Sequence, residues 1–185
     1  EQCAMLFLDN INFLPTFNVN IFNTDSMKMR SLLLSLFLIV LALSSFGQNE
    51  NEINLALGAK APLTELVLHD INGEFVPVKK YLKENGIIVV FSCNTCPFVV
   101  GSDRFEGWEK QYNDLAQYAA ENNIGFVLIN SNQAKRENED SFEAMVQHAK
   151  KMNYTMPYLE DANSTMANAY GAKTTPHVYF FGGDF

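Results

Sequence analysis

The stretch Ile87-Ile88-Val89-Val90-Phe91-Ser92-Cys93-Asn94-Thr95-Cys96-Pro97 decides the fold expected for this chain. Its first five residues form a continuous apolar run of β-favouring side chains, which is typical of a strand buried on both faces of a parallel sheet. The run leads directly into two cysteines separated by two residues. Pro97 is tolerated in the first turn of a helix, where its missing N–H costs little. The stretch therefore predicts a buried strand, a Cys-x-x-Cys turn and a helix, a combination typical of redox chemistry.

The expected helix suggests how the two cysteines differ. Free N–H groups and a partial positive charge at a helix N-terminus stabilise a thiolate, and the pKa of a cysteine there falls from about 8.5 to roughly 3.5–7.5. We therefore expect Cys93 to be the exposed, attacking thiol. Cys96, which follows one turn further in and is expected to be less exposed, would resolve the mixed disulfide.

Strands and helices alternate along the rest of the chain. Upstream of the cysteines we expect a short strand over 64–68, a turn at Asn72-Gly73, an extended segment over 75–78 and a short helix over 78–84. Downstream, an apolar stripe predicts a helix over 103–121, and its members are Phe105, Trp108, Tyr112, Leu115 and Ala119.

The last third of the chain continues the alternation. A buried strand is expected over 125–129, and Asp140 followed by Glu143 reads as a capping box at the start of a helix. The remaining elements are a short extended segment, a short helix that ends at Gly171, and an apolar strand over 177–181. This order predicts an α/β fold with a central, mixed but largely parallel sheet flanked by helices.

The first 60 residues are expected to lie outside the folded domain, which we place at 61–185. A basic start, a short apolar run and a small-residue exit are typical of a secretory signal peptide, here over 27–47. Residues 1–26 show no periodicity and are interpreted as an upstream extension, and residues 48–60 as a flexible segment. The apolar run is shorter than the roughly 20 residues of a membrane-spanning helix, so an uncleaved anchor is the less favoured alternative. We expect an exported protein, periplasmic or secreted, that leaves the membrane when the signal is cleaved.

The net charge and the number of cysteines argue against several classes of function. The 185-residue chain carries a formal net charge of -8, and an acidic surface repels the phosphates of nucleic acids. Of its three cysteines, Cys3 lies before the expected signal peptide. The other two are too close in sequence for their disulfide to stabilise a fold appreciably. One Cys-x-x-Cys supplies two of the four ligands that structural zinc needs. A redox role is therefore favoured over zinc and over idle thiols, and no cofactor is expected.

A second feature is the Thr175-Pro176 pair, which precedes the last expected strand. An X-Pro bond held in a tight turn can be cis, and a cis-proline retained by a fold usually has a purpose. An ordinary trans-proline at the start of a strand is the alternative. The residues alone do not decide between a cis and a trans bond at Thr175-Pro176.

Taken together, the Cys-x-x-Cys between a strand and a helix and the later run Gly171-Ala172-Lys173-Thr174-Thr175-Pro176 resemble the thioredoxin superfamily. More narrowly, the chain resembles the exported peroxiredoxin-like branch (redoxin, AhpC/TSA-type) that keeps a Cys-x-x-Cys. The resemblance implies a thioredoxin-like fold with a cis Pro176 packed beside the cysteines. It also implies that the backbone of Thr175 pairs with an extended substrate segment, that the partners are protein thiols and disulfides, and that an electron donor exists.

The departures from that pattern rank the possible functions. Ser92 replaces the tryptophan that thioredoxin carries before its first cysteine, and Ile87 replaces its buried acid. The peroxiredoxin motif P-x-x-x-T-x-x-C fits neither cysteine, and neither Arg104 nor Arg136 is identified as a peroxide-activating arginine. Disulfide exchange is therefore favoured over peroxidase activity.

Two further expectations complete the prediction. A copper site made of the two cysteines and His177 is a third hypothesis, although related copper chaperones space their cysteines one residue further apart. The family resemblance also implies one more strand and a closing helix after residue 181, both of which are missing from this sequence. We therefore expect that the natural protein extends beyond Phe185.

Overall fold

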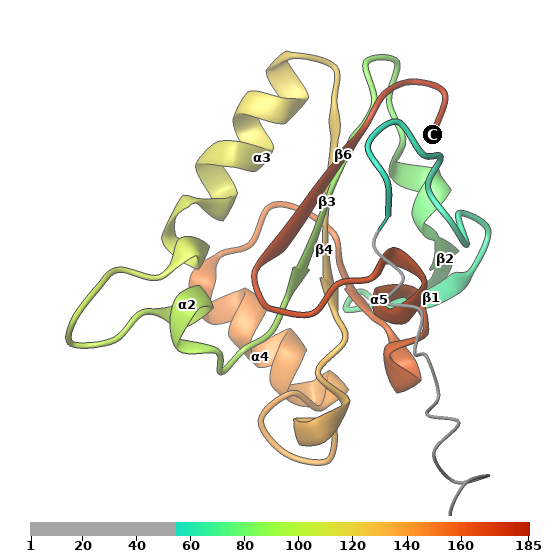
Figure 1. The fold of residues 1–185 in the computed structure, drawn as a ribbon. Helices are drawn as coiled ribbons and strands as arrows, with labels where there is room; N and C mark the ends of the chain where they lie inside the picture. Colours follow the sequence, from blue (N-terminus) through green and yellow to red (C-terminus); the bar gives the residue numbers. More distant parts are fainter. Residues whose placement is uncertain (1–54) are drawn as a thin grey trace, which may run out of the picture. The chain divides into compact units, whose positions relative to one another are not determined.

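The structure is a computed structural model that describes residues 55–185 (Figure 1). These residues belong to one compact unit, Asn51–Phe185. The expected upstream extension, the expected signal peptide and the first part of the expected flexible segment lie outside the described residues.

A six-stranded mixed sheet forms the centre of the unit, in the order β2-β1-β5-β4-β3-β6. The central strands β3, β4 and β5 are parallel to one another, whereas β1 and β2, β1 and β5, and β3 and β6 pair antiparallel. The expected parallel arrangement thus holds for the middle of the sheet, and its outer pairings are antiparallel. The strands are β1 (Val67–Asp70), β2 (Phe75–Pro77), β3 (Ile87–Ser92), β4 (Gly125–Asn130), β5 (Tyr158–Glu160) and β6 (His177–Phe181).

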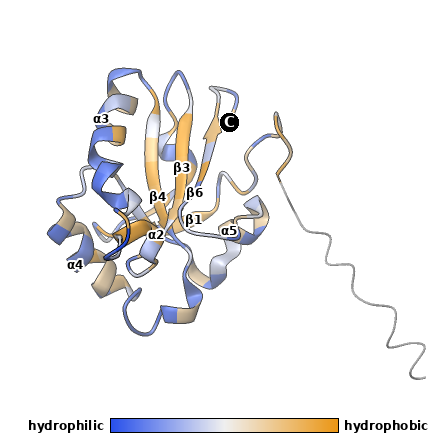
Figure 2. Ribbon diagram, turned by 60° about the vertical axis from the view of Figure 1, so that its left-hand side comes forward, coloured by the Kyte–Doolittle hydropathy of each residue, from blue (hydrophilic) through white to orange (hydrophobic). Residues whose placement is uncertain are grey.

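The register of β3 and β4 positions the functional end of the sheet. Ile87 pairs with Gly125 and Ser92 pairs with Asn130, so the two strands end side by side. All six residues of β4 are buried, as are five of the six in β3. Figure 2 shows both strands as largely hydrophobic ribbons. The loops that follow them, one carrying the cysteines and the other running from 131 to 141, therefore start from neighbouring points.

Helices cover both faces of the sheet (Figure 1). One face packs against α2 (Pro97–Val100), α3 (Tyr112–Glu121) and α4 (Phe142–Met152). The other packs against α5 (Thr165–Tyr170) and the 3-10 helix η1 (Val78–Tyr81). Three further 3-10 turns are η2 (Trp108–Gln111), η3 (Gln133–Lys135) and η4 (Ala162–Ser164).

The expected helix over 103–121 is wrong in its first part. The chain forms the short α2, turns through 101–107, and becomes regular α-helix only at Tyr112. Phe105 and Trp108, assigned to the buried stripe, are 41% and 48% exposed. The cause is tertiary, because Gly107 packs so tightly on α2 that an added Cβ would lie 2.0 Å from the carbonyl oxygen of Val99. The apolar spacing alone does not reveal that contact.

Smaller differences follow from local packing. The first strand is β1 rather than 64–68, and the helix expected over 78–84 is the single 3-10 turn η1. The expected turn at 72–73 is present, where Gly73 donates its N–H to the Asp70 carbonyl. The capping box is wrong: Ser141 caps α4 by accepting the N–H of Ala144 at 3.2 Å. The Asp140 carboxylate therefore does not cap α4 and can accept hydrogen bonds from other groups.

Within the described part of the chain, β6 pairs with β3 alone and forms one edge of the sheet. Its Val178 and Phe180 side chains are 49% and 59% exposed. The extension expected beyond Phe185 stays a prediction. None of the helices formed by residues 55–185 is long and apolar enough to cross a membrane.

Candidate functional site

The two cysteines lie at the carboxyl end of β3, where the sequence places them. Both are free thiols, so the structure represents the dithiol form. Cys96, and not Cys93, is the N-cap of α2, and Pro97 takes the first helical position. The expectation that Cys93 starts the helix is therefore wrong by three residues, because the chain stays extended through the turn.

The burial of the two thiols is the reverse of what we expected. Cys93 is 4% exposed and belongs to the core cluster that also contains Val99 and Tyr112. Cys96 is partly exposed. Cys93 packs between the sheet and the helices that cover this face, whereas Cys96 lies at the N-cap of α2.

Hydrogen bonds give the two sulfurs different roles. Cys93 Sγ accepts the backbone N–H of Cys96 at 3.2 Å and lies 3.3 Å from the hydroxyl of Thr175. Cys96 Sγ donates to the carbonyl oxygen of Thr175 at 3.1 Å. A carbonyl only accepts, so this bond requires a protonated Cys96. The geometry thus holds Cys96 as a thiol and presents donors to Cys93, as a thiolate would need.

Burial raises the pKa of the Cys93 thiol above its ordinary value, and this effect outweighs the others. Hydrogen bonds from the Thr175 hydroxyl and from the backbone of Thr95 and Cys96 lower that pKa, and the charge of Asp140 raises it. The expected lowering is therefore wrong for the dithiol form. α2 has four residues, so few aligned peptide dipoles offset the loss of solvation.

The Thr175–Pro176 bond is cis, as the resemblance implies. It brings Thr175 against both sulfurs, across 82 and 79 positions of sequence. The backbone of Thr175 is expected to pair with a substrate segment, and in this form its carbonyl accepts from the Cys96 thiol.

The structure adds a residue that the sequence analysis missed as part of the site. Asp140 is fully buried, and its carboxylate accepts the backbone N–H of Asn94 at 2.7 Å and the hydroxyl of Thr95 at 3.2 Å. Both donors lie between the two cysteines. A signal for this was present, since Ser141 next to it could cap the helix and release the acid.

Polar side chains from three strands support the same turn. Tyr158 donates its hydroxyl to the Asn94 side chain at 2.9 Å and accepts from Asn130 at 2.9 Å. Ser92, the residue in the tryptophan position of thioredoxin, is buried and lies 3.2 Å from the Tyr112 hydroxyl. The two residues that flank Cys93 in the sequence, Ser92 and Asn94, are thus each hydrogen-bonded to a buried tyrosine.

A cavity of about 680 Å³ opens beside the sulfurs. Cys93, Cys96 and Thr175 line one part of it, α5 lines another, and Lys135 and Lys173 contribute the charged side chains. The cavity has room for a peptide segment or a small thiol next to the reactive atoms. It is the place where a substrate could meet Cys93 in spite of that residue's burial.

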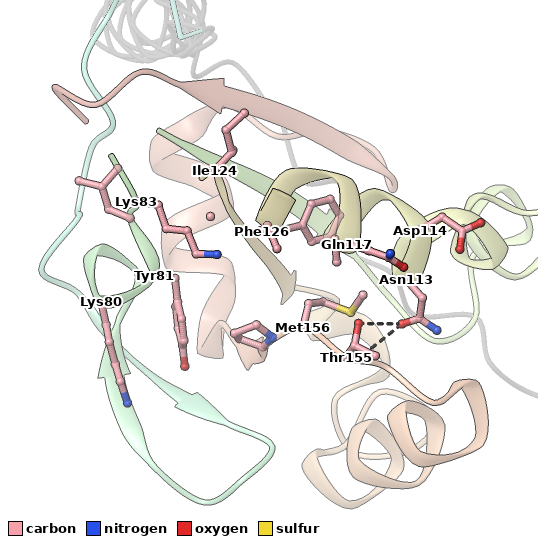
Figure 3. Close-up of a pocket in the computed structure, with 15 residues that line it drawn as sticks. Lys80, Tyr81, Lys83, Asn113, Asp114, Gln117, Ile124, Phe126, Thr155 and Met156 are labelled. Carbon is pink, nitrogen blue, oxygen red and sulfur yellow. Dashed lines mark hydrogen bonds between the residues drawn. The ribbon is translucent and has the colours of Figure 1, made fainter. Parts of the chain in front are cut away.

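A second cavity of about 590 Å³ lies at the opposite, amino ends of the parallel strands (Figure 3). Tyr81, Phe126 and Met156 are among the residues that line it, and a hydrogen bond joins Asn113 and Thr155 at its side. Neither Cys93 nor Cys96 lines this cavity.

The copper hypothesis finds no support in the described residues. Across 55–185, no group of three or more His, Cys, Asp or Glu side chains is placed to hold a metal ion. His177 stacks on Tyr179 with ring centroids 4.7 Å apart, and its buried Nδ1 has no hydrogen-bond partner. Burial lowers the pKa of His177.

The two arginines considered for peroxide activation are engaged elsewhere or exposed. Arg136 donates to the carbonyl oxygens of Asp140 and Asn130, at 2.7 and 2.8 Å, and lies 3.5 Å from Glu160. Arg104 is exposed on the 101–107 loop. Within residues 55–185, no hydrogen bond or ion pair of Arg104 or Arg136 involves a cysteine sulfur.

Comparisons with known proteins agree with this architecture. The model of the AhpC/TSA family matches residues 57–184. An uncharacterized conserved protein from Geobacillus kaustophilus is 32% identical with a TM-score of 0.62, and the match covers 71% of this chain and 66% of that one. A hypothetical protein from Sinorhizobium meliloti is 27% identical with a TM-score of 0.56, covering 66% and 63%. The chain thus spans just under two thirds of the length of each.

A more distant structure has the same fold. A secreted disulfide oxidoreductase of Mycobacterium tuberculosis, described as homologous to E. coli DsbE, is 19% identical with a TM-score of 0.51, and the match covers 68% of this chain and 81% of that one. No curated protein matches the chain. The expected thioredoxin-like fold is confirmed.

Proposed function

Since this chain belongs to the AhpC/TSA family, we propose that it is a thiol–disulfide oxidoreductase whose redox pair is Cys93 and Cys96. The observation that carries the proposal is the opposite hydrogen bonding of the two sulfurs. One sulfur accepts a backbone N–H and the other donates its proton to Thr175. A nucleophile and a resolving thiol need this asymmetry.

The proposed reaction uses both sulfurs in turn. The Cys93 thiolate attacks a substrate disulfide, forming a Cys93–substrate bond while the first substrate sulfur leaves and takes up a proton. Cys96 then loses its proton and attacks the Cys93 sulfur, releasing the second substrate thiol. The pair ends as a disulfide, two electrons have passed to the substrate, and a dithiol donor restores the pair. The same steps in reverse oxidise a dithiol substrate.

The proposed substrates are extended segments of exported proteins. Such a segment would pair with the backbone of Thr175 next to Pro176 and lie in the cavity beside the sulfurs. A substrate N–H that binds the Thr175 carbonyl competes with the Cys96 thiol for the same oxygen. Substrate binding would thereby free Cys96 to attack, which links recognition to the second step.

A thiol peroxidase is the second candidate, and one observation favours it. The Thr175 hydroxyl lies 3.3 Å from Cys93 Sγ, so the fold supplies a threonine at the sulfur even though the sequence lacks P-x-x-x-T-x-x-C. The candidate ranks second because neither Arg104 nor Arg136 is assigned to the site.

The test is reduction of insulin disulfides by the full chain with dithiothreitol as donor, beside hydrogen peroxide consumption. We expect insulin reduction that Cys93→Ser abolishes, and slow peroxide turnover. Cys96→Ser should accumulate mixed disulfides through Cys93, identified by mass spectrometry. Mixed disulfides that form through Cys96 in the Cys93→Ser protein instead would reverse the two roles, and fast peroxide turnover lost in Cys93→Ser would reverse the ranking.

A further inference from the structure

The turn between the two cysteines is hydrogen-bonded to one buried carboxylate, that of Asp140. Asp140 Oδ1 accepts the Asn94 backbone N–H at 2.7 Å and the Asn130 side-chain amide at 2.7 Å. Its Oδ2 accepts the Asn132 side-chain amide at 2.7 Å and the Thr95 hydroxyl at 3.2 Å. Asp140 reaches the turn from 46 residues away in sequence, at the end of the loop that joins β4 to α4.

These four partners indicate an ionised side chain. Three are N–H groups, which only donate, and they occupy both oxygens, so the carboxyl has to accept on both sides. The neighbouring cation does not neutralise it directly. Arg136 donates to the backbone carbonyl of Asp140 and pairs with Glu160. A negative charge with neutral donors around it is therefore buried directly behind the Cys93–Cys96 turn.

We propose that Asp140 is the positioning residue of the redox pair: its carboxylate holds the Asn94–Thr95 turn in place, and its buried negative charge opposes a second negative charge on the neighbouring Cys93 sulfur. The inference rests on the proposed function. Holding Asn94 and Thr95 from behind leaves the N–H of Cys96 directed at the Cys93 sulfur. The same carboxylate therefore builds the donor arrangement that a thiolate uses and opposes the charge that the thiolate would carry.

The other ionisable groups around Cys93 are a second thiol and three phenols. They are Cys96 in the same turn, Tyr112 of α3, Tyr154 after α4 and Tyr158 of β5. Burial raises the pKa of Tyr112 to about 12 and raises the pKa values of Tyr154 and Tyr158 as well. Glu109 lies behind them, bound to His148 and Tyr154, and the lysines of the cavity are Lys135 and Lys173. Burial is the main cause of the raised pKa of Cys93, and Asp140 is the anion that adds to it.

One consequence concerns the direction of electron flow. At pH values near or above the pKa of Cys93, a group that disfavours the thiolate disfavours the reduced form of the pair, and a less stable reduced form gives a more reducing couple. In that pH range Asp140 would thus bias the pair toward donating electrons. Its replacement by a neutral side chain should raise the reduction potential of the couple measured there.

The experiment compares Asp140→Asn with Asp161→Asn in the full chain carrying Cys96→Ser. Asparagine keeps an oxygen for the Asn94 N–H and removes the charge. Asp161 is the matched control, because it is also fully buried but binds the N–H groups of Met166 and Ala167 in α5. The rate of Cys93 alkylation by iodoacetamide is followed against pH by peptide mass spectrometry. We expect the midpoint to shift to lower pH in Asp140→Asn and to stay in place in Asp161→Asn.

A second variant keeps the proposal testable if Asp140→Asn does not fold. Thr95→Val removes one donor from the carboxylate, which leaves more of its charge facing Cys93, so the midpoint should move to higher pH. Where Asp140→Asn does fold, the same change in that background should move the midpoint little. An unchanged midpoint in Asp140→Asn, an equal shift in Asp161→Asn, or no upward shift in Thr95→Val overturns the proposal. A shifted midpoint, together with no insulin reduction by the chain that keeps both cysteines, would refute the proposed function and leave this role of Asp140 standing.

Discussion

At the scale of single residues, Thr175 does most to distinguish the two sulfurs. Its hydroxyl lies beside Cys93 and its carbonyl accepts from Cys96. One residue therefore favours the charged form of one sulfur and the protonated form of the other. Because the carbonyl belongs to the backbone, substitution can remove only the first of these effects, and that separation makes the residue useful for experiment.

Thr175→Val should slow reaction at Cys93 without breaking the fold. The hydroxyl hydrogen bond lowers the pKa of Cys93, so its loss raises that pKa further and leaves less thiolate at neutral pH. Since a hydrogen bond to a charged group contributes about 1.5–3 kcal/mol, we expect iodoacetamide alkylation at pH 7 and insulin reduction to fall by roughly tenfold or more.

Two variants control this prediction. Thr175→Ser retains a hydroxyl and should recover most of the alkylation rate. Thr174→Val changes the exposed neighbour and should leave the rate near that of the unaltered protein. Equal rates in Thr175→Val and the unaltered protein would show that the hydroxyl does not act on the sulfur.

At the scale of elements, the short α2 and the 101–107 loop form one packed unit beside the cysteines. Gly101 ends α2 with φ at +89°, and Gly107 lies against the last turn of the helix. The exposed rings of Phe98 and Phe105 stack with centroids 5.3 Å apart across the same unit. This packing replaces the long helix that the apolar spacing predicts, and it holds the C-terminal end of α2, whose N-terminus Cys96 caps.

Gly107→Ala should destabilise the protein by about 1–3 kcal/mol, the usual range for overpacking. The added Cβ would lie 2.0 Å from the Val99 carbonyl oxygen and 2.2 Å from the Gly101 nitrogen, and backbone atoms cannot move aside cheaply. The free energy of urea unfolding measures the effect, and faster alkylation of Cys96 would show that α2 has loosened.

Gly182→Ala provides the comparison for this experiment. Its added Cβ would meet a side-chain oxygen of Asp184 at 3.4 Å, an ordinary contact, so we expect a change within about 0.5 kcal/mol. If the two alanine variants prove equally stable, the close packing of the loop on α2 is wrong.

At the scale of the whole molecule, buried phenol groups make the fold sensitive to alkali. Tyr112, Tyr158 and Tyr170 are at most 1% exposed, and Tyr154 is partly buried beside Tyr112 and Tyr158. Burial raises the pKa of Tyr112 to about 12 and raises the pKa values of the other three. The folded protein therefore keeps these groups protonated at pH values where the unfolded chain has lost the protons.

The free energy of unfolding should fall as pH rises above about 10, the ordinary tyrosine pKa. Above that pH the unfolded chain binds fewer protons than the folded one, so stability decreases with pH. Below it, both states are protonated and the contribution is fully present. Urea unfolding between pH 8 and 11 measures this loss. In a Tyr118→Phe variant, which removes a tyrosine that is 65% exposed, tyrosinate absorbance should appear together with unfolding. Stability that stays constant to pH 11, or tyrosinate formed without unfolding in that variant, would contradict the assigned burial.

Much of the molecule is determined by the sequence itself. The continuous apolar runs predict β3 and β4, the spacing of Cys93 and Cys96 predicts the redox motif, and the run ending in Thr175-Pro176 predicts the family. These features are local, because strand propensity, turn chemistry and cysteine spacing act over a few residues. The tertiary structure alone decided which cysteine is buried, where α3 begins, and that Asp140 supports the site. Each of these features depends on contacts between segments that are distant in sequence, such as the hydrogen bond between Asp140 and Asn94, which are 46 residues apart. No periodic pattern in the sequence predicts such contacts.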